Sequence, residues 1–251
     1  MSSSVHLRLE SVTVDFPVYH TSARSLKNRL LHHGTGGRIG RGAGNRLTVR
    51  ALEDVNLSFE HGVRVGLVGH NGAGKSTMLR VLAGAYEPTR GHVRRRGRTA
   101  SLLSVSLGID PEGTGYDNIM RRGLLLGLMP EQVRERTEEI AEFTELGAYL
   151  DMPVHTYSAG MRFRLAFSVC TCFEPEILLM DEWFGVSDPS FIEKANRRLE
   201  EFVDRAGILV LASQNAPLLK RICDTGVMLG AGRVKARGPI GEVLQKYRQA
   251  A

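Results

Sequence analysis

The chain has 251 residues, of which 42% are hydrophobic and 24% are charged, and its formal net charge is +6. This length and composition fit one large α/β domain and exclude a disordered or fibrous protein. No apolar run approaches the roughly 20 residues needed to span a bilayer, and the first nine residues lack the apolar stretch of a signal peptide, which predicts a cytoplasmic protein.

An N-terminal β region is predicted over about residues 1–62, because Val5–Phe16 and Leu47–Phe59 alternate apolar and polar residues like strands. A glycine-rich insertion at 20–46 interrupts it and predicts a flexible loop. No acidic residue occurs between Phe16 and Leu52, and the seven basic ones are Arg24, Lys27, Arg29, Arg38, Arg41, Arg46 and Arg50. Two interpretations of this basic insertion stay open: a solvated loop, or a surface that touches anionic lipid headgroups or a membrane-embedded partner.

A phosphate-binding loop is predicted after a strand that begins at Val63, and Ser76–Leu82 continues with helical spacing. The loop matches G-x-x-x-x-G-K-[ST] with Gly69, His70, Asn71, Gly72, Ala73, Gly74, Lys75, Ser76 and Thr77. Its glycines let successive N–H groups point at phosphates, Lys75 neutralises phosphate charge, and Ser76 holds Mg²⁺ through its hydroxyl. The pattern therefore predicts a site for ATP and Mg²⁺.

A helical part is predicted at about residues 110–172. The stretch from Tyr116 to about Leu150 is typical of helices, with Val133, Ile140 and Phe143 on the face opposite the charged residues.

The cysteines are too few for a disulfide framework and lack partners for a zinc site. Those predicted to be reduced and buried are Cys170, Cys172 and Cys223.

Two continuously apolar runs, Ile177–Met180 and Ile208–Leu211, predict strands buried on both faces. Helical stretches after each run indicate a parallel sheet with crossovers. Asp181 and Glu182 follow the first run, where ligands of open α/β sheets bind. Asp181 suits an indirect contact with Mg²⁺, and Glu182 suits polarising an attacking water. Two short strands and a final helix are predicted after Gly226.

Between the phosphate loop and the acidic strand, Ser158 and Gly160 stand at the start of a predicted helix, in the run Tyr-Ser-Ala-Gly-Met-Arg. With these three motifs in order, the chain resembles the ATPases of ABC transporters. The resemblance implies an α/β P-loop NTPase fold with a mixed, largely parallel sheet, an antiparallel β region and a helical insert, all in one nucleotide-binding domain over 1–251. It also implies a homodimer, in which Ser158 and Gly160 of one subunit contact the γ phosphate held by the other.

The resemblance narrows to ATPases that export lipid-linked polysaccharides of the O-antigen, capsule, teichoic acid or galactan type. It rests on the stretches Ser25–Lys27, Arg50–Val55, Tyr86–Gly91, Gly108–Glu112, Gly115–Ile119 and Thr156–Arg162. It implies an ATP-hydrolysing subunit, peripheral on the cytoplasmic face of the cell membrane, which serves an integral membrane permease and does not bind nucleic acid. Two alternatives stay open: a drug or lipid exporter, and a non-transport ABC ATPase that acts on nucleic acid.

The same resemblance implies further site residues. Phe16 matches the aromatic residue that stacks on adenine, with Tyr19 as a rival, and Asp188 matches a loop that crosses the dimer interface. Ser104 stands where the family usually has glutamine or an acidic residue. Gln214 stands where most members have a histidine that contacts the γ phosphate, so Glu182 and Gln214 are the predicted catalytic pair.

Overall fold

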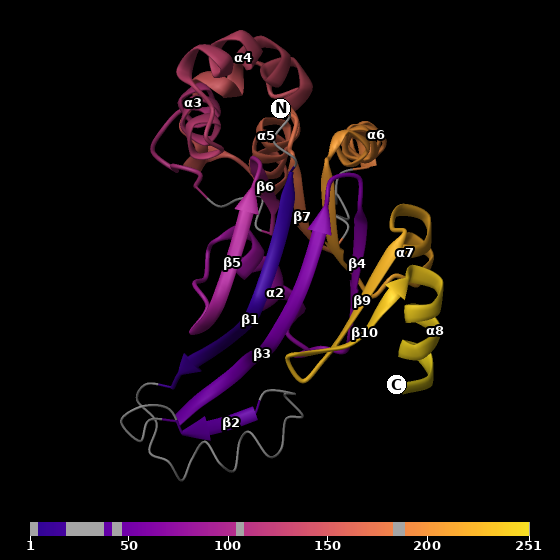
Figure 1. Ribbon diagram of the computed structural model, residues 1–251. Coiled ribbons are helices and arrows are strands. Elements are labelled where there is room, and N and C mark those ends of the chain that lie inside the picture. Colours follow the sequence, from indigo (N-terminus) through magenta and orange to yellow (C-terminus); the bar gives the residue numbers. More distant parts are fainter. Residues whose placement is uncertain (1–4, 19–37, 42–46, 104–107, 183–188, 251) are drawn as a thin grey trace. The chain divides into compact units, whose positions relative to one another are not determined.

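The computed structural model describes residues 5–18, 38–41, 47–103, 108–182 and 189–250. These residues form two compact units (Figure 1). Unit 1 comprises the described residues within Met1–Gly97, Leu179–Trp183 and Gly207–Ala251, and unit 2 those within Arg98–Leu178 and Phe184–Ala206. None of the helices in these ranges has both the length and the apolar content that a bilayer crossing demands.

Unit 1 begins with an antiparallel sheet of strand order β2-β3-β1-β5. Its strands are β1 (His6–Pro17), β2 (Arg38–Arg41), β3 (Leu47–Glu60) and β5 (Arg90–Arg96). The two long strands and their antiparallel pairing confirm the predicted β region. The prediction of a loop over 20–46 is wrong for Arg38–Arg41, which form β2. These four residues pair with Leu47–Arg50, so they supply hydrogen-bond partners to backbone groups at the edge of β3. The rest of that insertion lies outside the described residues.

A second sheet in unit 1 has the strand order β10-β9-β4-β8-β7. Its strands are β4 (Arg64–Val68), β7 (Ile177–Asp181), β8 (Ile208–Ala212), β9 (Thr225–Gly230) and β10 (Arg233–Pro239), of which β7 contributes its last three residues to this unit. Strand β4 pairs parallel with β8 and β9, whereas β10 pairs antiparallel with β9. The sheet is therefore mixed, as predicted.

The described residues of unit 1 include the helices α2 (Lys75–Ala83), α7 (Ala216–Ile222) and α8 (Ile240–Ala250). Helix α2 contacts β3, β5 and β8, so it packs against both sheets. Helix α8 contacts β4, β9 and α7. Strand β8 is buried throughout, since each residue of Ile208–Ala212 is at most 1% exposed. The phosphate loop therefore connects β4, an interior strand of this sheet, to the start of α2.

Unit 2 is mainly helical. It contains β6 (Thr99–Leu102), α3 (Gly115–Leu125), α4 (Pro130–Thr144), the 3₁₀ turns η1 (Gly147–Asp151) and η2 (Val154–Thr156), α5 (Ala159–Thr171) and α6 (Pro189–Arg205). Local chemistry starts these helices: Thr114 and Asp117 form a capping box at α3, and Pro130 occupies the first turn of α4. The boundaries predicted for the helical part, about 110–172, stay a prediction.

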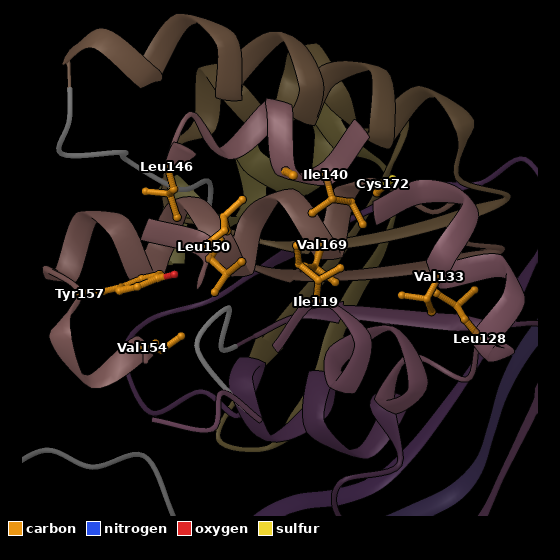
Figure 2. Packing of buried hydrophobic residues seen from close by; sticks show 12 residues of the cluster. Ile119, Leu128, Val133, Ile140, Leu146, Leu150, Val154, Tyr157, Val169 and Cys172 are labelled. Atoms are coloured by element: carbon orange, nitrogen blue, oxygen red, sulfur yellow. The ribbon is translucent and has the colours of Figure 1, made fainter. Parts of the chain in front are cut away.

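Apolar side chains from α3, α4, η1 and α5 meet in one core in unit 2 (Figure 2). Ile119, Val133 and Ile140 are 0% exposed within it, which confirms the apolar face predicted for α4. Burying such side chains is the main source of stability for short helices, since isolated helices of this length are marginal in water.

Candidate functional site

The phosphate loop joins the end of β4 to the start of α2 and requires glycine at two positions. Gly74 has φ +108°, and a Cβ there would lie 2.9 Å from the Ala51 carbonyl oxygen. A Cβ on Gly69 would lie 2.5 Å from the carbonyl oxygen of Leu229. Gly74 also offers no side chain to cap α2. The start of the helix therefore presents backbone N–H groups that favour an anion.

Lys75 lies within the curl of this loop and is only 9% exposed. Its Nζ donates hydrogen bonds to the carbonyl oxygens of Gly69 at 2.6 Å and His70 at 3.2 Å. Burial lowers the pKa of Lys75, and the nearby carboxylates of Glu182 and Asp181 oppose that shift. The cation is thus held by carbonyl dipoles and attracted by the nearby carboxylates, at a position where it can meet phosphate oxygens.

A cavity of about 410 Å³ opens beside Lys75. It is lined by Val49, Ala51, Asn71, Gly72, Gly74, Lys75, Ser76, Thr77, Asp181, Glu182 and Gln214. All of these residues belong to unit 1. The cavity brings together residues from four places that are far apart in the sequence: β3, the phosphate loop, the end of β7 and the residues after β8. Such convergence of polar groups in a hollow is typical of a ligand site.

The acidic end of β7 is held by the residues that end β8 and follow it. Glu182 has φ +67°, and its backbone N–H donates to the carbonyl oxygen of Ala212 at 2.8 Å. Its Oε2 accepts a hydrogen bond from Ser213 Oγ at 2.8 Å. Gln214, the next residue, donates from Nε2 to Asn71 Oδ1 at 2.7 Å. Both carboxylate-bearing residues of the motif therefore face the phosphate loop across the cavity.

Oxygen ligands suited to a magnesium ion are present. The Ser76 hydroxyl and the Asp181 carboxylate line the same cavity. The described residues hold no group of three or more His, Cys, Asp or Glu side chains that could form a metal site by themselves. One hydroxyl and one carboxylate fit Mg²⁺, which usually keeps several waters and binds through few protein ligands together with phosphates.

Phe16 lies on β1 beside the cavity wall. Its cross-strand partner in the sheet is Val49, which lines the cavity. The Phe16 ring packs edge-on against Tyr86, with ring centroids 5.3 Å apart and planes at 73°. Directly paired residues on neighbouring strands share a face of the sheet, so Phe16 stands next to the apolar part of the wall.

Ser158 and Gly160 lie in unit 2, at the start of α5. Ser158 is the N-cap, and its Oγ accepts a hydrogen bond from the backbone N–H of Met161 at 3.2 Å. Tyr157, before it, is 3% exposed and donates its hydroxyl to the carbonyl oxygen of Tyr149. This buried anchor fixes the chain as it enters the helix, where Ser158 is exposed and Gly160 is half-buried.

Of the other predicted positions, Gly69, His70 and Ala73 belong to the loop without lining the cavity. Tyr19, Ser104 and Asp188 lie outside the described residues. Sequence reasoning missed Val49, Ala51 and Ser213. Val49 and Ala51 have no chemical group that suggests a ligand site. They line the cavity because β3 runs beside the phosphate loop. Ser213 could have been suggested only by its position directly after a buried strand.

The cysteines are not part of this site. All three are free and buried, as predicted. Burial raises the pKa of Cys172 to about 11 and that of Cys223 to about 12. Their thiols therefore stay protonated near neutral pH, which makes them poor nucleophiles and poor metal ligands.

Comparison with known proteins places the site in context. Residues 52–185 match the family model described as ABC transporter. The chain is 45% identical to the O-antigen export system ATP-binding protein RfbE of Yersinia enterocolitica over 87% of this chain and 91% of that protein. It is 36% identical to RfbB, of the same description, from Klebsiella pneumoniae over 97% of this chain and 98% of that protein.

A solved dimeric ATP-binding cassette, captured after hydrolysis with ADP and Pi, shares the fold of this chain. The TM-score is 0.65 at 20% identity, covering 93% of this chain and 98% of that one. At such low identity the likeness concerns the fold alone.

Proposed function

Because this chain belongs to the ABC transporter family as an ATP-binding subunit, we propose that it binds and hydrolyses ATP with Mg²⁺ to drive export of a lipid-linked polysaccharide. The observation that carries the proposal is the cavity in which the phosphate loop, Lys75 and Glu182 converge. The polysaccharide is proposed because relatives that match most of the chain are described as O-antigen export proteins.

Each cavity residue has a proposed task. The loop backbone and Lys75 hold the phosphates of ATP by N–H donors and positive charge. Ser76 and Asp181 hold Mg²⁺, which neutralises phosphate charge when it is bound. Glu182 orients the attacking water and accepts its proton, since its carboxylate faces the cavity. Gln214 offers an amide donor beside Asn71. Phe16 supports the adenine from the Val49 side of the wall.

The working form proposed is a homodimer on the cytoplasmic face of the cell membrane, bound to an integral membrane permease that carries the glycan. In it, Ser158 and Gly160 of a second copy reach the phosphates, and Asp188 lies at the interface. Support comes from the position of Ser158 and Gly160 at a helix start, where Ser158 is exposed and N–H groups favour anions. Further support is that a structure with the same fold is a dimer.

The proposal is tested in two stages. The purified chain is first assayed for Mg²⁺-dependent ATP hydrolysis, with Glu182→Gln as the matched inactive control. The gene is then deleted in its host, and surface polysaccharide is measured after complementation with the wild type or with Glu182→Gln. Loss of surface polysaccharide restored only by the wild type is expected. Hydrolysis without any change in surface polysaccharide would show that the exported substrate is another one.

A further inference from the structure

A short segment after β8 contacts both sides of the cavity. Ser213 is 1% exposed, although it follows the last residue of the strand. Its backbone N–H donates to the carbonyl oxygen of Leu67 on β4 at 3.4 Å. A hydroxyl at such a buried position must find hydrogen-bond partners, because an unsatisfied buried polar group is costly.

The Ser213 hydroxyl has two partners, and together they fix its direction. It accepts a hydrogen bond from the backbone N–H of Asn215 at 3.1 Å. It lies 2.8 Å from Glu182 Oε2. An ionised carboxylate can only accept, so the single hydroxyl proton of Ser213 must point at Glu182. The chain of donors therefore runs from the Asn215 backbone through Ser213 to the carboxylate.

Glu182 needs such a support. It is exposed, and its backbone is in the left-handed region with φ +67°, which is uncommon for a residue with a side chain. The backbone is tied to Ala212 and the carboxylate to Ser213, so two consecutive residues hold the two ends of Glu182. A free glutamate would spread over several rotamers, at a substantial entropic cost when it must be ordered for reaction.

We propose that Ser213 is a positioning residue for ATP hydrolysis. Its hydroxyl fixes Oε2 of Glu182 and leaves Oε1 to orient the attacking water. This inference rests on the proposed function, in which Glu182 is the group that acts on water. The same segment contacts the phosphate loop through the hydrogen bond from Gln214 to Asn71. It therefore fixes the position of the Glu182 carboxylate relative to the loop.

The test compares Ser213→Ala with Ser213→Thr in the full chain. Hydrogen bonds to charged groups contribute enough to predict a fall in kcat of about tenfold to a hundredfold for Ser213→Ala. KM for ATP should stay within about twofold, because Ser213 does not line the cavity. Ser213→Thr keeps the hydroxyl and should recover most of kcat. An unchanged kcat in Ser213→Ala, measured on a wild type that hydrolyses ATP, would overturn the inference.

A double-mutant cycle shows whether Ser213 acts through Glu182. In a Glu182→Ala background, single-turnover hydrolysis should be the same with Ser213 or with alanine at that position. If Ser213→Ala slowed the Glu182→Ala protein as much as it slowed the wild type, its role would be general support of the fold, and the inference would be wrong.

Ser168→Ala is the matched control for the loss of a buried serine hydroxyl. Ser168 is 1% exposed on α5 in unit 2, and its Oγ donates to the carbonyl oxygen of Arg164 at 2.7 Å, away from Glu182. This variant should lower the melting temperature and leave kcat unchanged. A loss of kcat equal to that of Ser213→Ala would overturn the inference. A wild type without any ATPase activity would instead overturn the proposed function, and the inference with it.

Discussion

The cavity of unit 1 and the apolar core of unit 2 are organised by opposite means. The cavity is built on backbone conformation: Gly74 and Glu182 have positive φ, and Lys75 is held by loop carbonyls. The helical core is built on side-chain volume, with Ile119 and Ile140 fully buried among residues of four elements (Figure 2). Substitutions in the first region should therefore change chemistry, whereas those in the second should change stability.

Two cations of α6 in unit 2 lie over the ring of Phe143 on α4. Lys194 Nζ lies 4.7 Å from the centre of the Phe143 ring, and Arg198 lies 5.0 Å from it. Lys194 and Arg198 also pair with Glu145 at 2.7 Å and Glu139 at 2.6 Å. These contacts join α6 to α4 and its end. The charged side chains of α6 pack against an aromatic ring, whereas the charged side chains of the cavity line open space.

The largest separation of activity from stability is expected at Glu182. Changing Glu182→Gln removes the base and keeps the size and one acceptor oxygen. We expect kcat for ATP to fall by about 10²- to 10⁴-fold, because general base catalysis is lost. ATP affinity and melting temperature should stay near those of the wild type. Size analysis with ATP should show a dimer, since binding without turnover keeps the subunits together; only monomer would contradict the proposed dimeric site.

Lys75→Ala is expected to act on binding as well as on turnover. The cation is lost from the loop, so ATP hydrolysis should fall by about 10²- to 10³-fold, with a clear loss of ATP affinity. Fluorescence titration with a nucleotide analogue and a hydrolysis assay measure the two effects. Unchanged affinity and turnover would show that the loop does not bind phosphates.

Sequence alone predicted the elements of the cavity that are continuous in the chain. The phosphate loop and the strand ending in Asp181 and Glu182 are short runs whose meaning is local. The contacts between them are not local: Ser213 and Glu182 are 31 residues apart, and Gln214 and Asn71 are 143 apart. No motif encodes such pairs, because they depend on which strands become neighbours in the sheet.

The same limit explains what was missed in the fold. Strand β2 was predicted as loop because Arg-Ile-Gly-Arg has little strand character by itself, and only its pairing with β3 makes it a strand. The helices of unit 2 were predicted well from apolar spacing. Their mutual contacts, such as that of Gly123 with Val133, required the structure.

Ile140→Ala tests whether the apolar core of unit 2 contributes to stability as its packing predicts. Ile140 is 0% exposed in the helical core, so truncation should lower the free energy of unfolding by about 2 to 5 kcal/mol. Leu125→Ala is the matched control, because Leu125 is 66% exposed and its loss should change stability by no more than about 0.5 kcal/mol. Denaturant unfolding measures both. Equal stability of the two variants would contradict the packing described.

Gly123→Ala should have a smaller effect on stability. A Cβ on Gly123 would lie 2.4 Å from Val133 Cγ2, where α3 meets α4. The two helices must separate slightly, and we expect a loss of about 1 to 3 kcal/mol. Gly241→Ala is the control, since Gly241 lies in α8 and a Cβ there meets nothing within 4 Å. That change should be neutral or stabilising. Thermal unfolding distinguishes the two outcomes.

The smallest effect on activity, and the only gain in activity, is expected at Gln214. The amide donates to Asn71 and can supply one hydrogen bond to a phosphate oxygen, but it cannot carry a proton or a positive charge. Histidine can do both near neutral pH. We therefore expect slow but real ATPase activity in the wild type, and an increase of roughly two- to tenfold in Gln214→His, below the full 10²- to 10⁴-fold of acid–base catalysis because Glu182 already acts.

The pH dependence decides whether the gain at Gln214 is chemical. An imidazole changes charge around a pKa of about 6.5, so the advantage of Gln214→His should vary across roughly pH 6 to 8. A glutamine does not titrate, and the wild-type rate should show no such dependence from this position. Gln214→Asn keeps an amide on a shorter side chain, so it is the control for the effect of side-chain length at this position. Equal rates of the wild type and Gln214→His across that range would mean that this position does not limit catalysis, and the cavity would then depend on Glu182 and its support by Ser213.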